Sequence, residues 1–172
     1  MIMPRGEPLL LPVNPVFVVA SLVAGLAGNM LPLGRVVWMP DLLMLLLVFW
    51  GVHQPLRVGM GAAFLLGLCM DVNQSALLGQ HALSYTLLSF GAIAMHRRLL
   101  WFSVPLQALQ VFPLFALAHT GELLLRMAGG GIFPGLAGFL APVLETLLWP
   151  LASWVLLAPQ RRPPDSDQSR PL

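Results

Sequence analysis

Few residues in this sequence could do chemistry, and the clearest candidate is a lone acid beside an apolar run. The stretch GLCMDVNQSALLGQH, residues 67–81, places Asp71 at the end of the run and follows it with amides, a serine and a histidine. A carboxylate in a membrane-type helix is by default a candidate functional group, yet near a helix C-terminus the macrodipole disfavours it. Asp71 is therefore expected to bond to a partner: Arg35, Arg126, or donors of the turn 73–75.

Two further acids stand in or beside apolar runs. Asp41 follows Pro40 in MPDLLMLLLVFWG, residues 39–51, and a proline in the first helical turn with an acid just after it is typical of a helix start. Glu145 is the most deeply placed acid of the chain. It is either neutral, paired with an arginine, or facing a polar cavity, and the sequence leaves these three alternatives open.

The segment HTGE, residues 119–122, places His119 and Glu122 on one helical face, which is half of a metal-site pattern. No second histidine-rich helix and no HExxH motif completes it, so we do not expect a metal site. Glu122 also stands four residues before Arg126, and this is the spacing of an ion pair on a helix surface.

The sequence does not support nucleophilic catalysis. Ser75, Ser84, Ser89 and Ser103 have no accompanying histidine or lysine arrangement and no GxSxG motif. Cys69 is the only cysteine and lies inside an apolar run, so it has no partner for a disulfide or a thiolate metal site. We expect no enzymatic activity and no cofactor.

The composition is that of a membrane protein. Of the 172 residues, 58% are hydrophobic and 9% are charged, and the mean hydropathy is +0.82; an ordinary soluble domain has roughly 25% charged residues. The net charge of +2 comes from arginines scattered near the ends of apolar runs. Because these arginines form no basic stripe, nucleic-acid binding is not supported.

Six apolar stretches predict an all-α integral membrane protein with a single polytopic domain over residues 1–158. About 20 apolar residues cross a bilayer, and the spans are expected at about 13–33, 37–52, 58–72, 77–95, 99–125 and 137–158. Short polar turns are expected between them, including 73–75 and 96–98. The polar, proline-rich tail 159–172 is expected to be disordered and cytoplasmic.

The arginines favour a topology with both termini in the cytoplasm. In that topology six arginines lie on the inner side and two outside, the excess that the positive-inside rule predicts. The inner set is Arg5, Arg57, Arg97, Arg98, Arg161 and Arg162, and the outer set is Arg35 and Arg126. The tail arginines are expected to contact anionic lipid headgroups or a cytoplasmic partner.

Small residues form stripes on two of the expected helices. Gly59, Ala63, Gly67 and Asp71 lie four residues apart on the third span, and Ala20, Ala24 and Gly28 do so on the first. Such stripes let a neighbouring helix backbone approach closely in a membrane. We expect packing within this bundle, with a docking face for another protein's helix as the alternative.

Charged residues also gather at one side of the expected bundle. Arg35, Asp41, Asp71, Glu122 and Arg126 all fall toward the outer face when the six spans are laid out in order. The sequence therefore predicts an outer polar cluster.

Three segments, in this order and at these distances, resemble the family of the rod shape-determining protein MreD of bacteria. They are MPDLLMLLLVFWG, then GMGAAFLLGLCMDVNQSALLGQHALSY (59–85), and LLWP (147–150). The signature residues are Pro40, Asp41, Gly67, Asp71, Leu78, Gly79, Trp149 and Pro150. Glu145 departs from the family pattern, which has a neutral residue before the Leu-Trp-Pro, so no role is carried over to it.

The resemblance implies a multi-pass protein of the bacterial cytoplasmic (inner) membrane, without known enzymatic activity. It implies MreC as a partner, and indirectly the MreB filament, the glycosyltransferase RodA and a class B penicillin-binding protein. Together these guide peptidoglycan synthesis and maintain rod shape. The family is also similar in fold to the six-helix substrate-binding subunits of energy-coupling-factor transporters. A small-molecule-binding membrane subunit of a transporter is therefore the alternative function, although fold alone does not imply transport.

Overall fold

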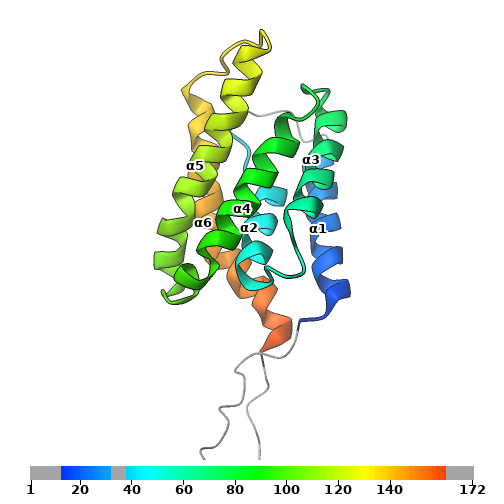
Figure 1. Ribbon diagram of the computed structural model, residues 1–172. Coiled ribbons are helices and arrows are strands. Elements are labelled where there is room, and N and C mark those ends of the chain that lie inside the picture. The colour runs from blue at the N-terminus through cyan, green and yellow to red at the C-terminus, as the bar shows by residue number, and fades with distance from the viewer. Residues whose placement is uncertain (1–12, 32–37, 162–172) are drawn as a thin grey trace, which may run out of the picture.

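The computed structural model describes residues 13–31 and 38–161 of the chain. This part forms six α-helices: α1 (Pro15–Met30), α2 (Leu42–His53), α3 (Met60–Gln74), α4 (Gln80–Leu100), α5 (Val104–Ala128) and α6 (Leu140–Leu157). Two 3-10 helices, η1 (Leu136–Phe139) and η2 (Ala158–Gln160), extend α6 at its two ends. Successive helices run in opposite directions in Figure 1, so the described part begins and ends at the same end of the bundle.

The all-helical prediction is confirmed for the described residues, with six helices in the predicted order. Two segments, Val104–Ala128 and Leu136–Gln160, are long and apolar enough to cross a membrane. The shortest helix, α2, has 12 residues and is about 18 Å long at 1.5 Å per residue. This is less than the roughly 30 Å of a bilayer's hydrocarbon core.

The second helix begins later than the sequence predicts. The span was expected from residue 37 with its helix start at Pro40, but α2 starts at Leu42. Asp41 is its N-cap residue and accepts a hydrogen bond from the backbone N–H of Met44 at 2.9 Å. Because a capping side chain must stand just before the first turn, Pro40 is left outside the helix.

Two expected turns are wrong in position. Of the turn 73–75, the first two residues belong to α3, and only Ser75 leaves the helix, with a left-handed φ of 52°. The residues 96–98 lie inside α4, which continues to Leu100. Arg97 and Arg98 occupy its last turn, where cations are favoured by the helix dipole, so charged residues at this point do not end the helix.

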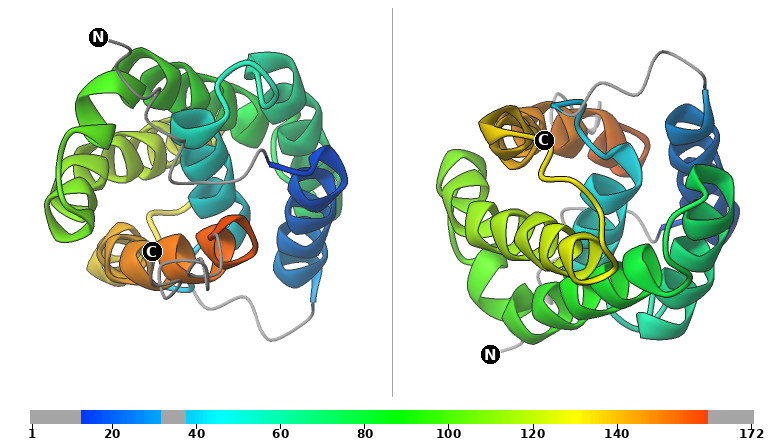
Figure 2. Two further views of the ribbon diagram at one scale, coloured as in Figure 1. Left: turned by 90° about the horizontal axis from the view of Figure 1, so that it is seen from below. Right: turned by 90° about the horizontal axis from the view of Figure 1, so that it is seen from above.

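Helix α2 lies in the middle of the bundle, as the two end views show (Figure 2), and packs against α1, α4 and α6. All but three of its residues are buried. A helix that is apolar on every side can be covered by other helices or by lipid. The sequence of α2 is therefore compatible with its position at the centre of the bundle.

Aromatic side chains connect this central helix to its neighbours. The rings of Phe49 and Trp149 lie 6.0 Å apart, and Phe17 meets Trp50 edge-on at 6.1 Å. The indole N–H of Trp50 donates to Ser21 Oγ at 2.8 Å. Buried tryptophans therefore link α2 to α1 and α6, and the indole N–H of each has an acceptor within the bundle.

The two ends of the bundle differ in charge. We call the end where α1 begins and α6 finishes the terminal end, and the opposite one the far end (Figure 1). Four arginines lie at the terminal end. Arg57 is in the α2–α3 connection, Arg97 and Arg98 are in the last turn of α4, and Arg161 follows η2. Arg126, near the end of α5, lies at the far end. Arg5, Arg35 and Arg162 lie outside the described residues.

Candidate functional site

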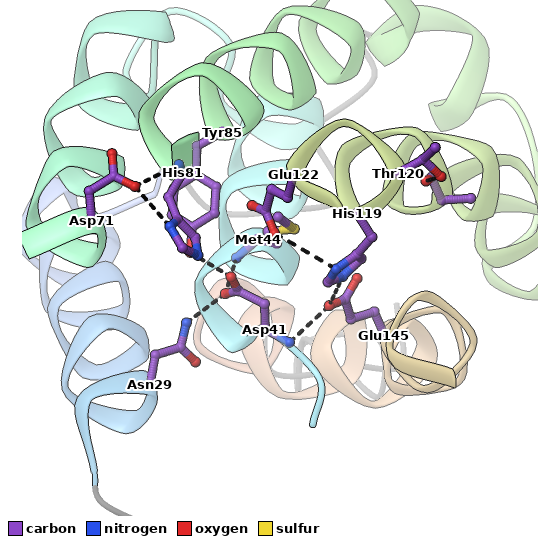
Figure 3. A network of polar contacts seen from close by, with 11 residues as sticks. Asn29, Asp41, Met44, Asp71, His81, Tyr85, His119, Thr120, Glu122 and Glu145 are labelled. Carbon is purple, nitrogen blue, oxygen red and sulfur yellow. Dashed lines mark hydrogen bonds and ion pairs between the residues drawn. The ribbon is translucent and has the colours of Figure 1, made fainter. Parts of the chain in front are cut away.

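The far end holds a network of polar side chains, each buried or half-buried, to which all six helices contribute (Figure 3). We call it the far-end network. Its members are Asn29 of α1, Asp41 before α2, Asp71 of α3, His81 and Tyr85 of α4, His119 and Glu122 of α5, and Glu145 of α6. Because odd-numbered helices finish at the far end and even-numbered helices begin there, residues near those termini converge although they are distant in sequence.

Asp41 is the most connected member of the network. Its carboxylate accepts hydrogen bonds from Asn29 Nδ2 at 2.6 Å and from the Tyr85 hydroxyl at 2.5 Å, in addition to the capping bond. Asn29 in turn accepts from the backbone N–H of Leu42 at 3.1 Å. The Pro-Asp start of α2 thus ties α1 and α4 to the first turn of the central helix.

Glu145 is buried and joins three helices. Its Oε1 accepts a hydrogen bond from the backbone N–H of Asp41 at 2.8 Å and lies 2.8 Å from His119 Nε2. Of the three alternatives that the sequence left open, pairing with an arginine does not occur among the described residues. The basic partner is His119, which the sequence had placed with Glu122 instead.

Asp71 has a partner, but it is neither of the predicted kinds. Its carboxylate accepts the backbone N–H groups of Gly79 at 2.8 Å, His81 at 2.7 Å and Ala82 at 3.4 Å, and it meets His81 Nδ1 at 2.8 Å. These donors belong to the start of α4, beyond the turn 73–75. Arg126 makes no ion pair with it, and Arg35 lies outside the described residues.

The first turn of α4 explains why Asp71 is needed. The first N–H groups of a helix have no partner within it. The N-cap residue of α4 is Gly79, which has no side chain to accept them and has a φ of +101°, a conformation that glycine adopts readily. Asp71 therefore caps α4 from the neighbouring helix, with its negative charge at the positive end of the α4 dipole.

Gly67 lets α3 and α4 approach closely enough for this cap. A Cβ added at Gly67 would lie 2.6 Å from the backbone nitrogen of Ala82 and 2.8 Å from the carbonyl carbon of His81. Ala63, one turn earlier, is fully buried. The stripe on α3 thus packs within the bundle, and Gly59, with nothing within 4 Å of an added Cβ, lies outside the close contact.

The stripe on α1 is placed differently. Ala20 and Ala24 are exposed on the outer side of α1, and Gly28 is half-buried against Leu42. Of the other signature residues, Leu78 is exposed in the α3–α4 connection and Pro150 is exposed on α6. Trp149 is fully buried, and its indole N–H lies 3.3 Å from Gln107 Oε1.

Four of the five residues of the predicted outer cluster lie at the far end. Asp41, Asp71 and Glu122 belong to the far-end network, Arg126 lies outside it, and Arg35 lies outside the described residues. The expected ion pair between Glu122 and Arg126 is absent, since Arg126 is exposed and Glu122 Oε2 instead lies 4.0 Å from His119 Nδ1. Among the described residues, therefore, no arginine neutralises the charge of these acids.

Sequence reasoning missed three members of the network. The sequence assigned no site role to His81, Tyr85 or Asn29, yet His81 and Tyr85 are buried. A signal was present: His81 and Tyr85 lie four residues apart on α4, so they share a face, and Tyr85 is the only tyrosine of the chain. The rings of His81 and Tyr85 meet edge-on, with their centroids 6.0 Å apart. This contact connects the hydrogen bonds around Asp71 with those around Asp41.

Replacing Tyr85 with phenylalanine tests the contact to Asp41. We expect Tyr85→Phe to lower the free energy of unfolding by about 1.5–3 kcal/mol, the range for a hydrogen bond to a charged group. Thermal unfolding of the purified protein in detergent measures this. The matched control is Thr86→Val, which removes a hydroxyl that donates only to Ala82 O of its own helix; equal losses in both variants would contradict the prediction.

The fold and the network define a helical membrane protein whose buried polar side chains bond its own helices to one another. No group of three or more histidine, cysteine or acidic side chains in the described ranges could hold a metal ion. The chain belongs to the family of the rod shape-determining protein MreD, whose sequence model matches residues 9–157. Membership gives it a role in determining rod shape.

A named relative agrees with this assignment. The Rod shape-determining protein MreD of Haemophilus influenzae is 32% identical over 130 residues, which are 73% of this chain and 76% of the relative. No solved structure matches the chain. The expected likeness to substrate-binding subunits of energy-coupling-factor transporters therefore stays a prediction.

Proposed function

We propose that this chain is a non-enzymatic membrane component of the complex that elongates rod-shaped bacteria. It lies in the cytoplasmic (inner) membrane and crosses it six times, with both termini in the cytoplasm. It acts with MreC to organise or regulate peptidoglycan synthesis along the cell cylinder. Through MreC it acts indirectly with MreB, RodA and a class B penicillin-binding protein.

The observation that carries the proposal is the family match over residues 9–157, together with the name of the relative in Haemophilus influenzae. The topology is supported by the arginines. Arg57, Arg97, Arg98 and Arg161 share the terminal end, and Arg126 lies at the far end. The positive-inside rule assigns the arginine-rich end to the cytoplasm, and the far-end network then lies toward the periplasm.

The environment of Asp71 supports a structural role over a reactive one. Each of its two oxygens accepts at least one N–H from the start of α4, and the side chain is fully buried. A carboxylate satisfied in this way has no free lone pair facing a substrate. The signature residues Gly67, Asp71 and Gly79 then hold α3 and α4 together. A partner protein would bind this helix pair as a preformed surface.

The alternative, a small-molecule-binding subunit of a transporter, rested on the outer polar cluster. Asp41 and Asp71 bond to groups of the bundle itself, so the network resembles a packed interior more than a ligand site. Mass spectrometry of the purified protein separates the two functions. A stoichiometric small molecule, with an ATPase partner encoded nearby, would favour the transporter subunit.

Loss of the protein in its host is expected to turn rods into spheres. Depletion followed by microscopy measures cell shape, and a plasmid copy of the gene should restore rods. Affinity purification of the tagged protein in mild detergent is expected to recover MreC at near-stoichiometric yield, with an unrelated multi-pass protein as the control bait. Rods that persist after depletion, or a purification without any member of the wall-synthesis complex, would count against the proposal.

A further inference from the structure

Two buried carboxyl oxygens in the far-end network have no hydrogen-bond donor. Glu122 Oε1 and Glu145 Oε2 are buried, and neither has a partner within the described part of the chain. The side chain of Glu145 is 0% exposed and that of Glu122 is 13% exposed. Buried polar groups are nearly always paired, so both oxygens require an explanation.

The other two acids of the network show what satisfied carboxylates look like here. Asp41 accepts from Asn29, Met44 and Tyr85, and each oxygen of Asp71 accepts a backbone N–H of α4. Both also lie at a helix N-terminus, where negative charge is favoured. Every oxygen of these two carboxylates therefore has a donor, whereas each glutamate retains a buried oxygen without one.

Among the residues that the structure describes, the only basic group between the glutamates is a histidine. In Figure 3 His119 lies between Glu122 and Glu145, with Nε2 at 2.8 Å from Glu145 Oε1 and Nδ1 at 4.0 Å from Glu122 Oε2. The second distance is too long for a hydrogen bond. Even a fully charged imidazolium carries one positive charge against the two carboxylates beside it and against Asp41.

Within the described ranges 13–31 and 38–161, nothing else that faces the row supplies the missing charge. The neighbouring titratable and polar groups are Asp41 from α2, Asp71 from α3, His81 and Tyr85 from α4, and Asn29 from α1. Asp41 and Asp71 add negative charge, and the Tyr85 hydroxyl is already donated to Asp41. His81 is engaged by Asp71 through Nδ1.

An unpaired carboxylate inside a bundle is so costly that it takes up a proton. We propose that Glu122, His119 and Glu145 form a buried proton-binding row in which at least one glutamate is a neutral carboxylic acid in the folded protein at neutral pH. The proton is transferred from a hydronium ion of the solvent: one O–H bond of the hydronium breaks, an O–H bond forms on an unpartnered carboxyl oxygen, and a water molecule is left. Since the row bridges α5 and α6 and reaches α2 through Asp41, proton binding is linked to the packing of these three helices.

Infrared spectroscopy of isotope-labelled protein tests the proposal directly. The chain has only three glutamates, Glu7, Glu122 and Glu145. Labelling glutamate side chains with ¹³C therefore reports the protonation state of the two glutamates of the row and of Glu7. At neutral pH we expect a labelled carbonyl stretch of a protonated carboxylic acid. It should decrease or vanish in at least one of the variants Glu122→Gln and Glu145→Gln, vanish in the double variant, and persist in the control Glu7→Gln.

Unfolding measurements give a second readout that does not depend on the spectrum. Glutamine resembles a neutral carboxylic acid in shape, so we expect Glu122→Gln to leave the melting temperature at neutral pH nearly unchanged. It should also flatten the loss of stability that wild type shows as the pH rises and the row loses its proton. The Glu7→Gln control should keep the wild-type pH dependence.

Two results would overturn the inference. One is a folded wild-type protein whose labelled glutamates are all ionised at neutral pH. The other is a melting temperature that rises with sodium chloride but not with choline chloride, in a protein without the protonated band. The latter result would assign the row to a metal cation instead of a proton.

Discussion

Asp71→Asn is expected to destabilise the protein by about 3 kcal/mol or more, although it changes one oxygen to an NH₂ group. The carboxylate accepts backbone N–H groups on both oxygens, from Gly79 on one side and His81 on the other. Either orientation of the amide turns its NH₂ toward one of these donors. Each unsatisfied buried donor costs about 1–3 kcal/mol, and the favourable charge at the start of α4 is lost as well.

Thermal unfolding in detergent and the amount of protein in the membrane measure this effect. The matched control is Asn73→Ala, two residues further along α3, whose side chain is exposed and makes none of the hydrogen bonds of the described part. Asp71→Asn should reduce the protein level and rod shape together, because the loss is one of folding. A variant with normal level and melting temperature but spherical cells would instead give Asp71 a direct role in partner binding.

The sequence predicts the need of Asp71 for a partner but not the partner itself. An acid at a helix C-terminus is disfavoured by its own dipole, and that argument requires only local information. Whether Asp71 bonds to an arginine or to the start of α4 depends on how α3 and α4 cross. The absent cap at Gly79 was a local clue, since a glycine N-cap leaves the first N–H groups of a helix without a side-chain acceptor.

Glu145 shows where sequence reasoning ends. Its burial follows from its place in an apolar run, but its neighbours are set by the relative heights of α5 and α6. His119 and Glu145 are 26 residues apart and belong to helices separated by a long connection. A shift of one turn in either helix, about 5.4 Å, would separate them, so periodicity alone cannot pair these residues.

Neither the central position of α2 nor its exact start could be predicted from the sequence. Ten consecutive apolar or small residues, 43–52, leave no polar face, but lipid can cover such a helix as well as other helices can. Pro40 and Asp41 both suit a helix start. The bonds from Asn29 and Tyr85 place Asp41 at the N-cap, and these are tertiary contacts.

Gly67→Ala is expected to be the most damaging small substitution in α3. The added methyl would lie 2.6 Å from Ala82 N and 2.8 Å from the carbonyl carbon of His81. Both are backbone atoms of α4, so no side chain can rotate away and the two helices must separate. Overpacking of this kind costs about 1–3 kcal/mol, occasionally more. It also pulls Asp71 away from the N–H groups that it caps, so the upper part of that range is expected.

The same helix offers a matched control at Gly61. A Cβ added there meets nothing within 4 Å, and alanine is favoured over glycine inside a helix by about 0.5–1 kcal/mol. Gly61→Ala should therefore be neutral or slightly stabilising, while Gly67→Ala lowers the melting temperature and the membrane level of the protein. Equal behaviour of the two variants would show that α3 and α4 are not in close contact in the membrane.

The double variant Gly67→Ala with Asp71→Asn then separates the direct clash at Gly67 from the loss of the Asp71 cap. If the glycine acts by positioning the cap, the double variant should lose less stability than the two single losses added together.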